Sequence, residues 1–485
     1  MINSGITILG LGPGDVSLLT LEAWRIIESI PEIYLRTRQH PAVIGFPGRL
    51  RVYSFDHLYE KGESFETIYA EIVEQVVELG RRPQGVVYAV PGHPLVAEAT
   101  SPEIARRARL ESLPIQVVGG MSFLEPVLNA LDLDVFPHSA LVDALELDSR
   151  HVPPFPPSAP AFIAQIHSRA VASNIKLTLM EVYPDGHPVH LVHAAGTPQV
   201  KVESLPLYEI DRSPHIGLMT TLYLPPLEPT SSFEAFQEVI ARLRAPDGCP
   251  WDREQTHQSL RSYLLEEVYE VLAALDADDP QSMREELGDL LLQIVLHAQI
   301  ASENGEFRMA DILTSIHDKI VRRHPHVFGD LYLDGADSVL QNWERLKAEE
   351  RLANGQADKG SLDGVPLALP ALSQAQEYQK RAARVKFDWP DIQGVYDKIL
   401  EEIEEVQGAG SEKRPPEVGD LLFAVVNLAR WCNVDAESVL REASARFRVR
   451  FNYMEKLAHA EGRELATLSL EEMESYWQEA KKAES

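Results

Sequence analysis

Two pairs of acidic residues beside apolar helix faces are the first feature of this sequence that points to chemistry. In "LLEEVYEVLAALD", residues 264–276, the apolar residues form one stripe if a helix advances by about 100° per residue. Glu267 lies at the edge of that stripe, and Glu270 lies about 60° further round. The string "ILEEIEEVQ" repeats the pattern with Glu402 and Glu405. Carboxylates held beside an apolar face in this way suit the binding of a cation.

A second acid pair follows each of the first ones. "EELGDLLLQIVLHA" begins with Glu286 and Asp289, and "PEVGDLLFAVVNLA" begins with Glu417 and Asp420. Apolar residues nearly surround the first of these helices, so we expect it to be buried. Four carboxylates gathered in a low-dielectric place would repel one another and take up protons. A divalent cation removes this repulsion, and Mg²⁺ is the common choice where substrate phosphates share the ligation.

The alternative is that these acids are solvated side chains on surface helices, which explains any single E-x-x-E pattern better. Here E-x-x-E precedes E-x-x-D and an apolar run, and this combination occurs twice, which favours a metal site. Fifteen residues separate Glu270 from Glu286, but only eleven separate Glu405 from Glu417. The shorter second connection, "VQGAGSEKRPPE", leaves open which copy does the chemistry.

Basic pairs follow the acids in both copies. Lys319 and Arg323 share one helical face in "HDKIVRRHPHVFG", and Arg446 and Arg450 do so in "SARFRVRFNYMEK". Such a pair can hold the phosphate tail of a substrate beside a metal. Taken alone, each pair would be explained better by a solvated face or by charge near a helix C-terminus, but beside the carboxylates phosphate binding is favoured.

The elements that carry these residues are helical. From residue 233 onward the periodicity is that of helices, after a linker "LPPLEPTSS" at 224–232. The polar segment 352–366 divides this half again, and the matching motifs predict an internal duplication of one helical module of roughly 110 residues. We therefore expect three domains: residues 1–226, 232–351 and 366–485.

The first part reads as an α/β domain. The strand-like segment at 5–15 runs into a Gly/Pro turn, and those at 85–92 and 115–120 end in glycine. Each precedes a helical stretch, which indicates a largely parallel sheet. Beyond a proline-rich joint, the segments "KLTLMEVYP", "HPVHLVHAAG" and "VKVESLPLYEI" look like strands of a second lobe. The expected fold class is thus multidomain, with a two-lobed α/β part followed by tandem all-α modules.

Composition narrows the possible partners. The formal net charge of −29 argues against general electrostatic binding to nucleic acid or to an anionic membrane. No apolar run reaches about 18 residues, so no membrane span is expected. With two cysteines and no leader-like N-terminus, we expect a cytoplasmic protein. The histidines of "RRHPHVF" and "HPVHLVH" lack the spacing of a zinc site and are expected to be structural.

The helical half resembles a known family. "LRAPDGCPWDREQTHQSL", "LLEEVYEVLAAL", "EELGDLLLQIVLHAQ", "RRHPHVFG" and "NWERLKAEER" are similar to motifs of the MazG nucleoside triphosphate pyrophosphohydrolases, and "LPALSQAQEYQKRAARVKFDWP" and "EVGDLLFAVVNLARW" resemble the second repeat of that family. The resemblance covers roughly residues 233–485. It implies an all-α fold that cleaves NTPs or dNTPs between the α and β phosphates, giving NMP and pyrophosphate, with Mg²⁺. It also suggests a homodimer.

The MazG resemblance assigns roles to particular residues. The implied metal ligands are Glu267, Glu270, Glu286, Asp289, Glu402, Glu405, Glu417 and Asp420. The implied phosphate-binding residues are Lys319, Arg323, Arg446 and Arg450, with arginine at 446 where the family often has lysine. A remaining carboxylate, Glu266 or Glu401, is the candidate that accepts a proton from the attacking water. Trp389 either stacks on a base or packs beside the proline that follows it.

Three glycine turns carry the resemblance of the first part. "LGLGPGD" is neither the dinucleotide fingerprint nor a P-loop, but with "YAVPGHPLVAEAT" and "VVGGMSFLEPVLNALDLD" it resembles the tetrapyrrole methylases over about residues 5–225. That resemblance implies S-adenosylmethionine bound by five residues: Pro13, Gly92, His93, Met121 and Ser122. The family commonly has aspartate where this chain has His93, which puts methyl transfer to a tetrapyrrole in question. The order of the two parts resembles that of YabN-type proteins.

Two other readings stay open from the sequence. In one, the protein is an S-adenosylmethionine-dependent methyltransferase whose helical half only assembles oligomers. In the other, the helical half senses nucleotides without hydrolysing them. The leading hypothesis remains an NTP pyrophosphohydrolase with an appended methylase-like domain.

Overall fold

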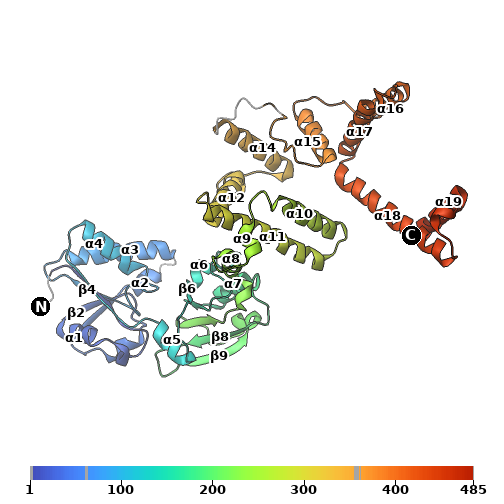
Figure 1. Cartoon of the computed structure of the whole chain (residues 1–485). Helices are drawn as coiled ribbons and strands as arrows, with labels where there is room; N and C mark the ends of the chain where they lie inside the picture. Colours follow the sequence, from blue (N-terminus) through green and yellow to red (C-terminus); the bar gives the residue numbers. More distant parts are fainter. Residues whose placement is uncertain (1–3, 61–63, 354–359, 361, 484–485) are drawn as a thin grey trace. The chain divides into compact units, whose positions relative to one another are not determined.

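The computed structural model describes residues 4–60, 64–353, 360 and 362–483 (Figure 1). It contains two compact units, Met1–Glu254 and Gln255–Ser485. The expected fold class is confirmed, because two sheets with helices occupy the first part and helices alone form the second. The first compact unit extends beyond the linker at 224–232, and the three domain limits expected from the sequence stay a prediction.

The first lobe is a parallel five-stranded sheet with the strand order β3-β2-β4-β1-β5. Its elements are β1 (Ile6–Gly10), α1 (Leu21–Ser29), β2 (Glu32–Leu35), β3 (Arg51–Ser54), α2 (Asp56–Tyr59), α3 (Phe65–Gly80), β4 (Val86–Val90), α4 (Thr100–Leu110) and β5 (Ile115–Val118). Helix α5 (Leu124–Leu131) follows β5 and packs Val127 against Phe162 and Val192 of the second lobe. Ile8 and Tyr88 pack under α3 and α4 on one face, whereas Leu9 and Ala89 pack under α1 on the other. Because the strands are parallel, the turns at their carboxyl ends meet at one edge.

The second lobe is a mixed sheet with the strand order β6-β7-β10-β8-β9. Its elements are β6 (Ala140–Asp143), α6 (Ala144–Leu147), β7 (Ala161–Ala164), α7 (Arg169–Met180), β8 (Pro188–His193), β9 (Lys201–Pro206) and β10 (Thr220–Leu224). The strand expected in "KLTLMEVYP" was wrong, since most of this segment ends helix α7. The buried residues Val171, Ile175 and Leu179 recur every four positions, which is a helical spacing that outweighs the short alternating run.

Helices and the segments that connect them make up the rest of the described chain. The helices are α8 (Phe233–Arg244) and α9 (Pro250–Glu254) in the first compact unit, then α10 (Arg261–Asp276), α11 (Pro280–Glu303), α12 (Met309–Arg323), α13 (Pro325–Phe328), α14 (Gly335–Ala353), α15 (Ala371–Arg384), α16 (Ile392–Gly408), α17 (Arg414–Trp431), α18 (Ala436–Ala460) and α19 (Leu470–Ala483). In the described part of the chain, no helix combines the length and the apolar character that crossing a membrane requires.

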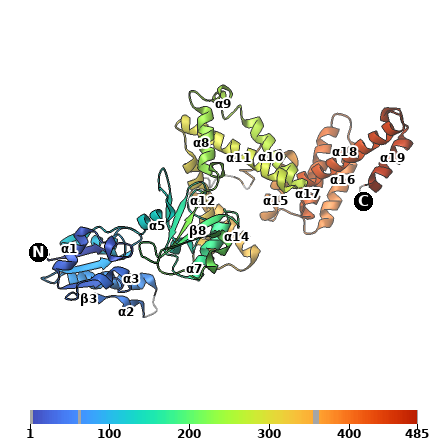
Figure 2. The ribbon, with the colours of Figure 1, turned by 90° about the horizontal axis from the view of Figure 1, so that it is seen from below.

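Two helical hairpins bring the acid pairs together. Helices α10 and α11 lie side by side, and so do α16 and α17 (Figures 1 and 2). The turn between α10 and α11 is short because Asp279 caps α11, accepting hydrogen bonds from the backbone amides of residues 281 and 282, and Pro280 starts the helix. Asp391 caps α16 in the same way. In each hairpin the E-x-x-E helix therefore runs beside the E-x-x-D helix.

The expectation that the second acid helix is buried all round was wrong for the single chain. On α11, Val295 and Leu296 are buried, but Leu287, Leu291 and Ile294 are 47%, 39% and 42% exposed. The apolar character was read correctly, but the neighbouring helices of the same chain cover only part of it. The uncovered part is a continuous apolar stripe.

Candidate functional site

The first acid cluster joins the two helices of the α10–α11 hairpin. One carboxylate oxygen from each of Glu267, Glu270 and Glu286 lies within 4.8 Å of the others. Asp289 lies one turn beyond Glu286 on α11, and its charge contributes to raising the pKa of Glu267. These are the four residues that the sequence singled out in the first repeat.

The electrostatics of this cluster are those of carboxylates without a counter-ion. Desolvation raises the pKa of Glu267, and the neighbouring charges of Asp289 and Glu270 raise it further. The pKa of Glu286 is raised by desolvation and by the charge of Glu270. Repulsion between like charges favours the protonated forms. Binding of a divalent cation would relieve it, so the donor set fits a hard cation such as Mg²⁺.

The second cluster has the same construction on α16 and α17. Oxygens of Glu402, Glu417 and Asp420 lie within 4.8 Å of one another, so the shorter connection between the helices still brings the acids together. Glu405 lies close by, since desolvation and the charges of Glu402 and Glu417 raise its pKa. Glu402 is buried, and its Oε2 atom has no hydrogen-bond partner among the described residues. A buried carboxylate oxygen without a partner is the kind of atom that a cation satisfies.

Lys398 is a residue of this site that the sequence reasoning missed. Its ammonium lies 2.8 Å from Oε1 of Glu401 and 2.7 Å from Oε1 of Glu402. The hydrogen bonds to Glu401 and Glu402 raise the pKa of Lys398. The spacing of three and four residues along one helix could have revealed it. The matching position of the first repeat is Tyr263.

The two candidate proton acceptors differ in their surroundings. Glu266 is exposed beside the first cluster, and its charge contributes to the raised pKa of Glu267. Glu401 is also exposed but is engaged by Lys398. Of the two, Glu266 is the one that has no lysine bonded to it in the described structure.

The basic pair of the first repeat lies on α12. Lys319 and Arg323 are half-buried and one turn apart. Arg323 donates to Glu350 of α14, with Nη2 2.6 Å from Oε2, and its guanidinium lies 5.4 Å from the ring centre of Trp343. Arg323 is thus an ion-pair partner within the helical unit, in addition to any contact with a substrate.

The basic pair of the second repeat lies on α18. Arg446 is exposed, and its guanidinium is 3.6 Å from Glu442 on the same helix. Arg450 lies over the ring of Trp477 from α19, at 5.6 Å. Trp389 is 44% exposed and its ring packs against the backbone of Gly394, at the start of α16, where a Cβ atom would meet the ring at 2.7 Å. That contact is the packing role considered for Trp389, and stacking on a base stays a prediction.

The three glycine turns of the first lobe converge at the carboxyl edge of the sheet. Gly12 and Gly92 exchange backbone hydrogen bonds of 3.2 and 2.7 Å. A Cβ atom on Gly120 would lie 2.5 Å from the carbonyl oxygen of Gly92, and one on Gly10 would lie 2.6 Å from the amide nitrogen of Gly120. The turns therefore approach so closely that no side chain fits between them. Such a surface presents backbone groups to a ligand.

The five residues expected to bind S-adenosylmethionine are all in these turns. Pro13 is buried and faces Gly196 of the second lobe, where a Cβ atom would lie 3.2 Å from the proline ring. The Nδ1 atom of His93 accepts a hydrogen bond from the amide of residue 95. Ser122 is buried, and its hydroxyl donates a hydrogen bond of 2.6 Å to Glu125 in the first turn of α5. Gly92 and Met121 are half-buried in the second and third turns.

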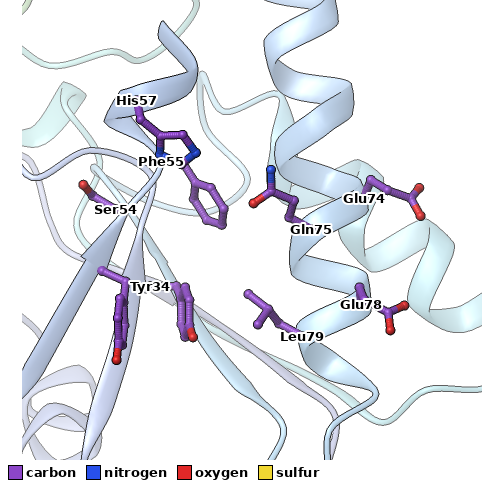
Figure 3. Close-up of a pocket in the computed structure, with 9 residues that line it drawn as sticks. Tyr34, Ser54, Phe55, His57, Glu74, Gln75, Glu78 and Leu79 are labelled. Atoms are coloured by element: carbon purple, nitrogen blue, oxygen red, sulfur yellow. The ribbon is translucent and has the colours of Figure 1, made fainter. Parts of the chain in front are cut away.

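A separate cavity of about 510 Å³ lies between the edge of the sheet and α3 (Figure 3). Leu79 and Gln75 point toward Tyr34 and Phe55, whereas Glu74 points away from them (Figure 3). Glu74, which also lines the cavity, is paired with Arg107 at 2.6 Å. The residues that line the cavity do not include the five expected cofactor residues. We therefore place the candidate cofactor site at the glycine turns and not in this cavity.

Comparison with known families separates the α/β part of the chain from its helical part. The model of the tetrapyrrole (corrin/porphyrin) methylases matches residues 5–211, and the model of the MazG nucleotide pyrophosphohydrolase domain matches residues 255–328. The nucleoside triphosphate pyrophosphohydrolase of Escherichia coli K12 is 46% identical over 253 residues, which are 51% of this chain and 95% of that protein. The nucleoside triphosphate pyrophosphohydrolase/pyrophosphatase MazG of Thermotoga maritima is 44% identical over 250 residues, 51% of this chain and 95% of that protein.

Other matches concern the first half or the whole chain. The uroporphyrin-III C-methyltransferase structure from Thermus thermophilus matches 46% of this chain and 93% of its own, with 20% identity and a TM-score of 0.35. The uncharacterized protein YabN of Bacillus subtilis is 41% identical over 494 aligned positions that cover 99% of both chains. Since one relative matches over its full length and both parts match their own family models, the chain belongs to the YabN family, in which a tetrapyrrole methylase domain precedes a MazG nucleotide pyrophosphohydrolase domain.

Proposed function

We propose that the helical half hydrolyses nucleoside triphosphates to nucleoside monophosphate and pyrophosphate in the presence of Mg²⁺. The observation that carries this proposal is the pair of carboxylate clusters, each built from two neighbouring helices with three oxygens within 4.8 Å. The likeness to named nucleoside triphosphate pyrophosphohydrolases supports it. Carboxylates alone would repel a triphosphate, so the clusters serve this substrate only with a cation between them.

Some residues of the first repeat would bind the cation, and another would accept a proton. Glu267, Glu270, Glu286 and Asp289 would hold Mg²⁺. When bound, Mg²⁺ supplies positive charge that neutralises the phosphates and lowers the pKa of a water. Glu266 would accept a proton from that water. The oxygen of the water would bond to phosphorus as pyrophosphate departs.

In the second repeat Glu402, Glu405, Glu417 and Asp420 would hold the cation, and Glu401 would accept the proton. Glu401 must first part from Lys398, which bonds to it in the structure. The phosphate tail would be bound by the basic pairs of the two repeats: Lys319, Arg323, Arg446 and Arg450. Trp389 would stack on a base through its exposed face.

Pyrophosphate release by the full-length protein tests this function. The protein is incubated with a mixed pool of NTPs and dNTPs, with Mg²⁺ or with a chelator, and pyrophosphate and nucleoside monophosphate are measured. We expect both products in equal amounts and only with Mg²⁺. Nucleotide binding without turnover would favour a sensing module instead, and neither binding nor turnover would remove the nucleotide function altogether.

We also propose that the first half binds S-adenosylmethionine at its glycine turns. The close approach of Gly10, Gly92 and Gly120 leaves backbone groups facing the edge where ligands of parallel sheets bind. Calorimetric titration of the full-length protein with S-adenosylmethionine tests the site. Gly120→Ala should lose the binding, because its Cβ atom would meet the carbonyl of Gly92, whereas Gly186→Ala, at a loop position with open space, should keep it.

A homodimer is the assembly that the exposed apolar stripes favour. Leu287, Leu291 and Ile294 of α11 correspond to Val418, Leu422 and Val425 of α17, and all six are at least 39% exposed in the single chain. Stripes of this kind on a soluble protein mark a surface that another subunit covers. We propose that a second copy of this chain covers them.

A further inference from the structure

A polar stripe continues beyond the metal ligands on helix α11. Glu286, Asp289, Gln293 and His297 lie within about 80° of one another around the helix. Gln293 is about 6 Å and His297 about 12 Å along the helix axis from Asp289. Gln293 is only 5% exposed, and His297 is half-buried. The stripe thus leads from the carboxylates into the protein.

Two atoms of this stripe are buried without hydrogen-bond partners among the described residues. They are Oε1 of Gln293 and Nε2 of His297. A buried polar atom without a partner is unfavourable, and native proteins retain few of them. Both lie on the side of α11 that carries the predicted ligands, so a bound molecule that reaches past the carboxylates can satisfy them.

The hydrogen bonds around His297 identify which kind of partner is missing. The Nδ1 atoms of His257 and His297 are 2.8 Å apart, in rings that are parallel to within 6°. The other nitrogen of His257, Nε2, faces the carboxylate of Glu306 at 3.6 Å, which favours a proton on that nitrogen.

Nδ1 of His257 is then the acceptor, and Nδ1–H of His297 donates to it. The Nε2 atom of His297 is left as an acceptor. Burial and the neighbouring His257 both lower the pKa of His297, which keeps this ring neutral. Gln293 Oε1 and His297 Nε2 therefore both require a donor.

The second repeat lacks this pair. Ala424 and Leu428 occupy the positions that match Gln293 and His297. A buried glutamine of that repeat, Gln379, comes from α15 and donates to the backbone carbonyl of Phe423 at 2.7 Å. The two repeats thus keep the same carboxylate clusters but differ in the side chains beside them.

We propose that Gln293 and His297 form a base-binding subsite of the first repeat that accepts hydrogen bonds from the amino groups of adenine, cytosine or guanine. The proposal rests on the proposed hydrolysis of nucleoside triphosphates. The amino groups of these bases are donors, whereas thymine and uracil present a carbonyl oxygen where cytosine has its amino group. A nucleotide whose phosphates lie at the carboxylates carries its base several ångströms away, which is also how far Gln293 lies from Asp289 along the helix. The subsite discriminates because a base that presents a carbonyl oxygen in place of the amino group would leave the two buried acceptors unsatisfied.

The test measures kcat/KM of the full-length protein carrying Glu417→Gln, so that turnover comes from the first repeat. The substrates are ATP, GTP, CTP, UTP and ribose 5-triphosphate, which has no base. Gln293→Met and His297→Leu each remove one acceptor, and each should lower kcat/KM about tenfold for ATP, GTP and CTP. Turnover of UTP and of ribose 5-triphosphate should stay within about twofold.

Gln299→Met is the matched control, because Gln299 lies on the opposite side of α11 and donates to Glu303 at 2.9 Å. It should leave the base profile unchanged. An unchanged profile in both Gln293→Met and His297→Leu overturns the subsite, while the proposed hydrolysis stands. An equal loss for all five substrates also overturns it, since the residues would then be structural.

Two results distinguish a failure of the proposed subsite from a failure of the proposed hydrolysis. Turnover by the unmodified protein but none by the Glu417→Gln protein overturns the subsite alone, because the first repeat would not be working. Absence of turnover in the unmodified protein overturns the hydrolysis and the subsite together.

Discussion

The ammonium of Lys398 lies 2.7 Å from Oε1 of Glu402, inside the second carboxylate cluster. Tyr263 occupies the matching place in the first repeat and brings no charge. The first cluster consequently has unbalanced negative charge, whereas the second is partly neutralised by the protein itself. The duplicated sites are alike in their carboxylates and different in how strongly they should attract a cation.

The two repeats should differ in Mg²⁺ affinity. Glu270→Gln leaves the second cluster intact, and Glu417→Gln leaves the first. We expect Mg²⁺ to bind about fivefold more weakly to the Glu270→Gln protein, because the cation must displace Lys398 from Glu402. Calorimetric titration with Mg²⁺ measures both affinities. Lys398→Met should remove most of the difference, and equal affinities before that change would show that Lys398 does not compete with the cation.

Arg323 should bind a substrate better once Glu350 releases it. The hydrogen bond from Arg323 lowers the pKa of Glu350, burial raises it, and the hydrogen bond from Arg322 lowers it further, to about 2. Glu350 is therefore ionised at neutral pH, and the ion pair is present. Glu350→Gln should lower KM for NTPs severalfold, whereas Arg323→Ala should raise it, because only a free guanidinium can bind the phosphates. Steady-state kinetics measure both. Arg322→Ala is the control, since Arg322 pairs with the same carboxylate. If KM stays constant in Glu350→Gln while the protein remains folded, Arg323 has only a structural role.

Breaking the apolar stripe should produce monomers. A lysine in place of Leu291 or Leu422 puts a charge in the surface that we expect a second copy to cover, which costs about 2 kcal/mol or more at a central interface residue. Light scattering at micromolar concentration should show a dimer for the unmodified protein and a monomer for each variant. Leu177→Lys, at a residue 60% exposed on α7, should leave the dimer intact. A monomeric unmodified protein would contradict the assembly.

The second lobe should lose stability in acid through Glu203. Burial would raise the pKa of Glu203, but hydrogen bonds from Ser213, Lys201 and His193 outweigh it and lower the pKa to about 2, from an ordinary 4.5. Because the folded-state pKa is the lower one, this stabilisation is complete above pH 4.5 and disappears as the pH falls to about 2. Thermal unfolding between pH 7 and pH 3 should show a smaller loss of Tm in Glu203→Gln, which starts from a lower Tm. Parallel curves for the two proteins would show that Glu203 does not contribute.

Local spacing explains what the sequence could predict. Glu267, Glu270 and Glu286 come together because two amphipathic helices joined by a capped turn must lie side by side, and the motif pattern contains that information. The glycine turns are predictable for the same reason, since parallel strands place their carboxyl ends at one edge. Lys398 could also have been identified from the sequence, because it lies four residues before Glu402 on one helix.

Other features depend on contacts that spacing does not reveal. Leu291 and Ile294 are apolar, yet whether the same chain or another one covers them depends on surfaces far away in the sequence. The pairing of Arg323 with Glu350 joins residues 27 positions apart and needs the arrangement of α12 and α14. Helix α7 was mistaken for a strand because a short alternating run fits both periods.

Loss of one carboxylate from each cluster tests the central claim most directly. Pyrophosphate release from ATP, GTP, CTP and UTP is measured for the full-length protein, for Glu270→Gln, for Glu417→Gln and for the double variant, with folding checked by thermal unfolding. The account predicts that at least one single variant loses activity and that the double variant falls by about 100-fold or more. Hydrolysis at the original rate in the double variant would contradict the assignment of these carboxylates as the metal site.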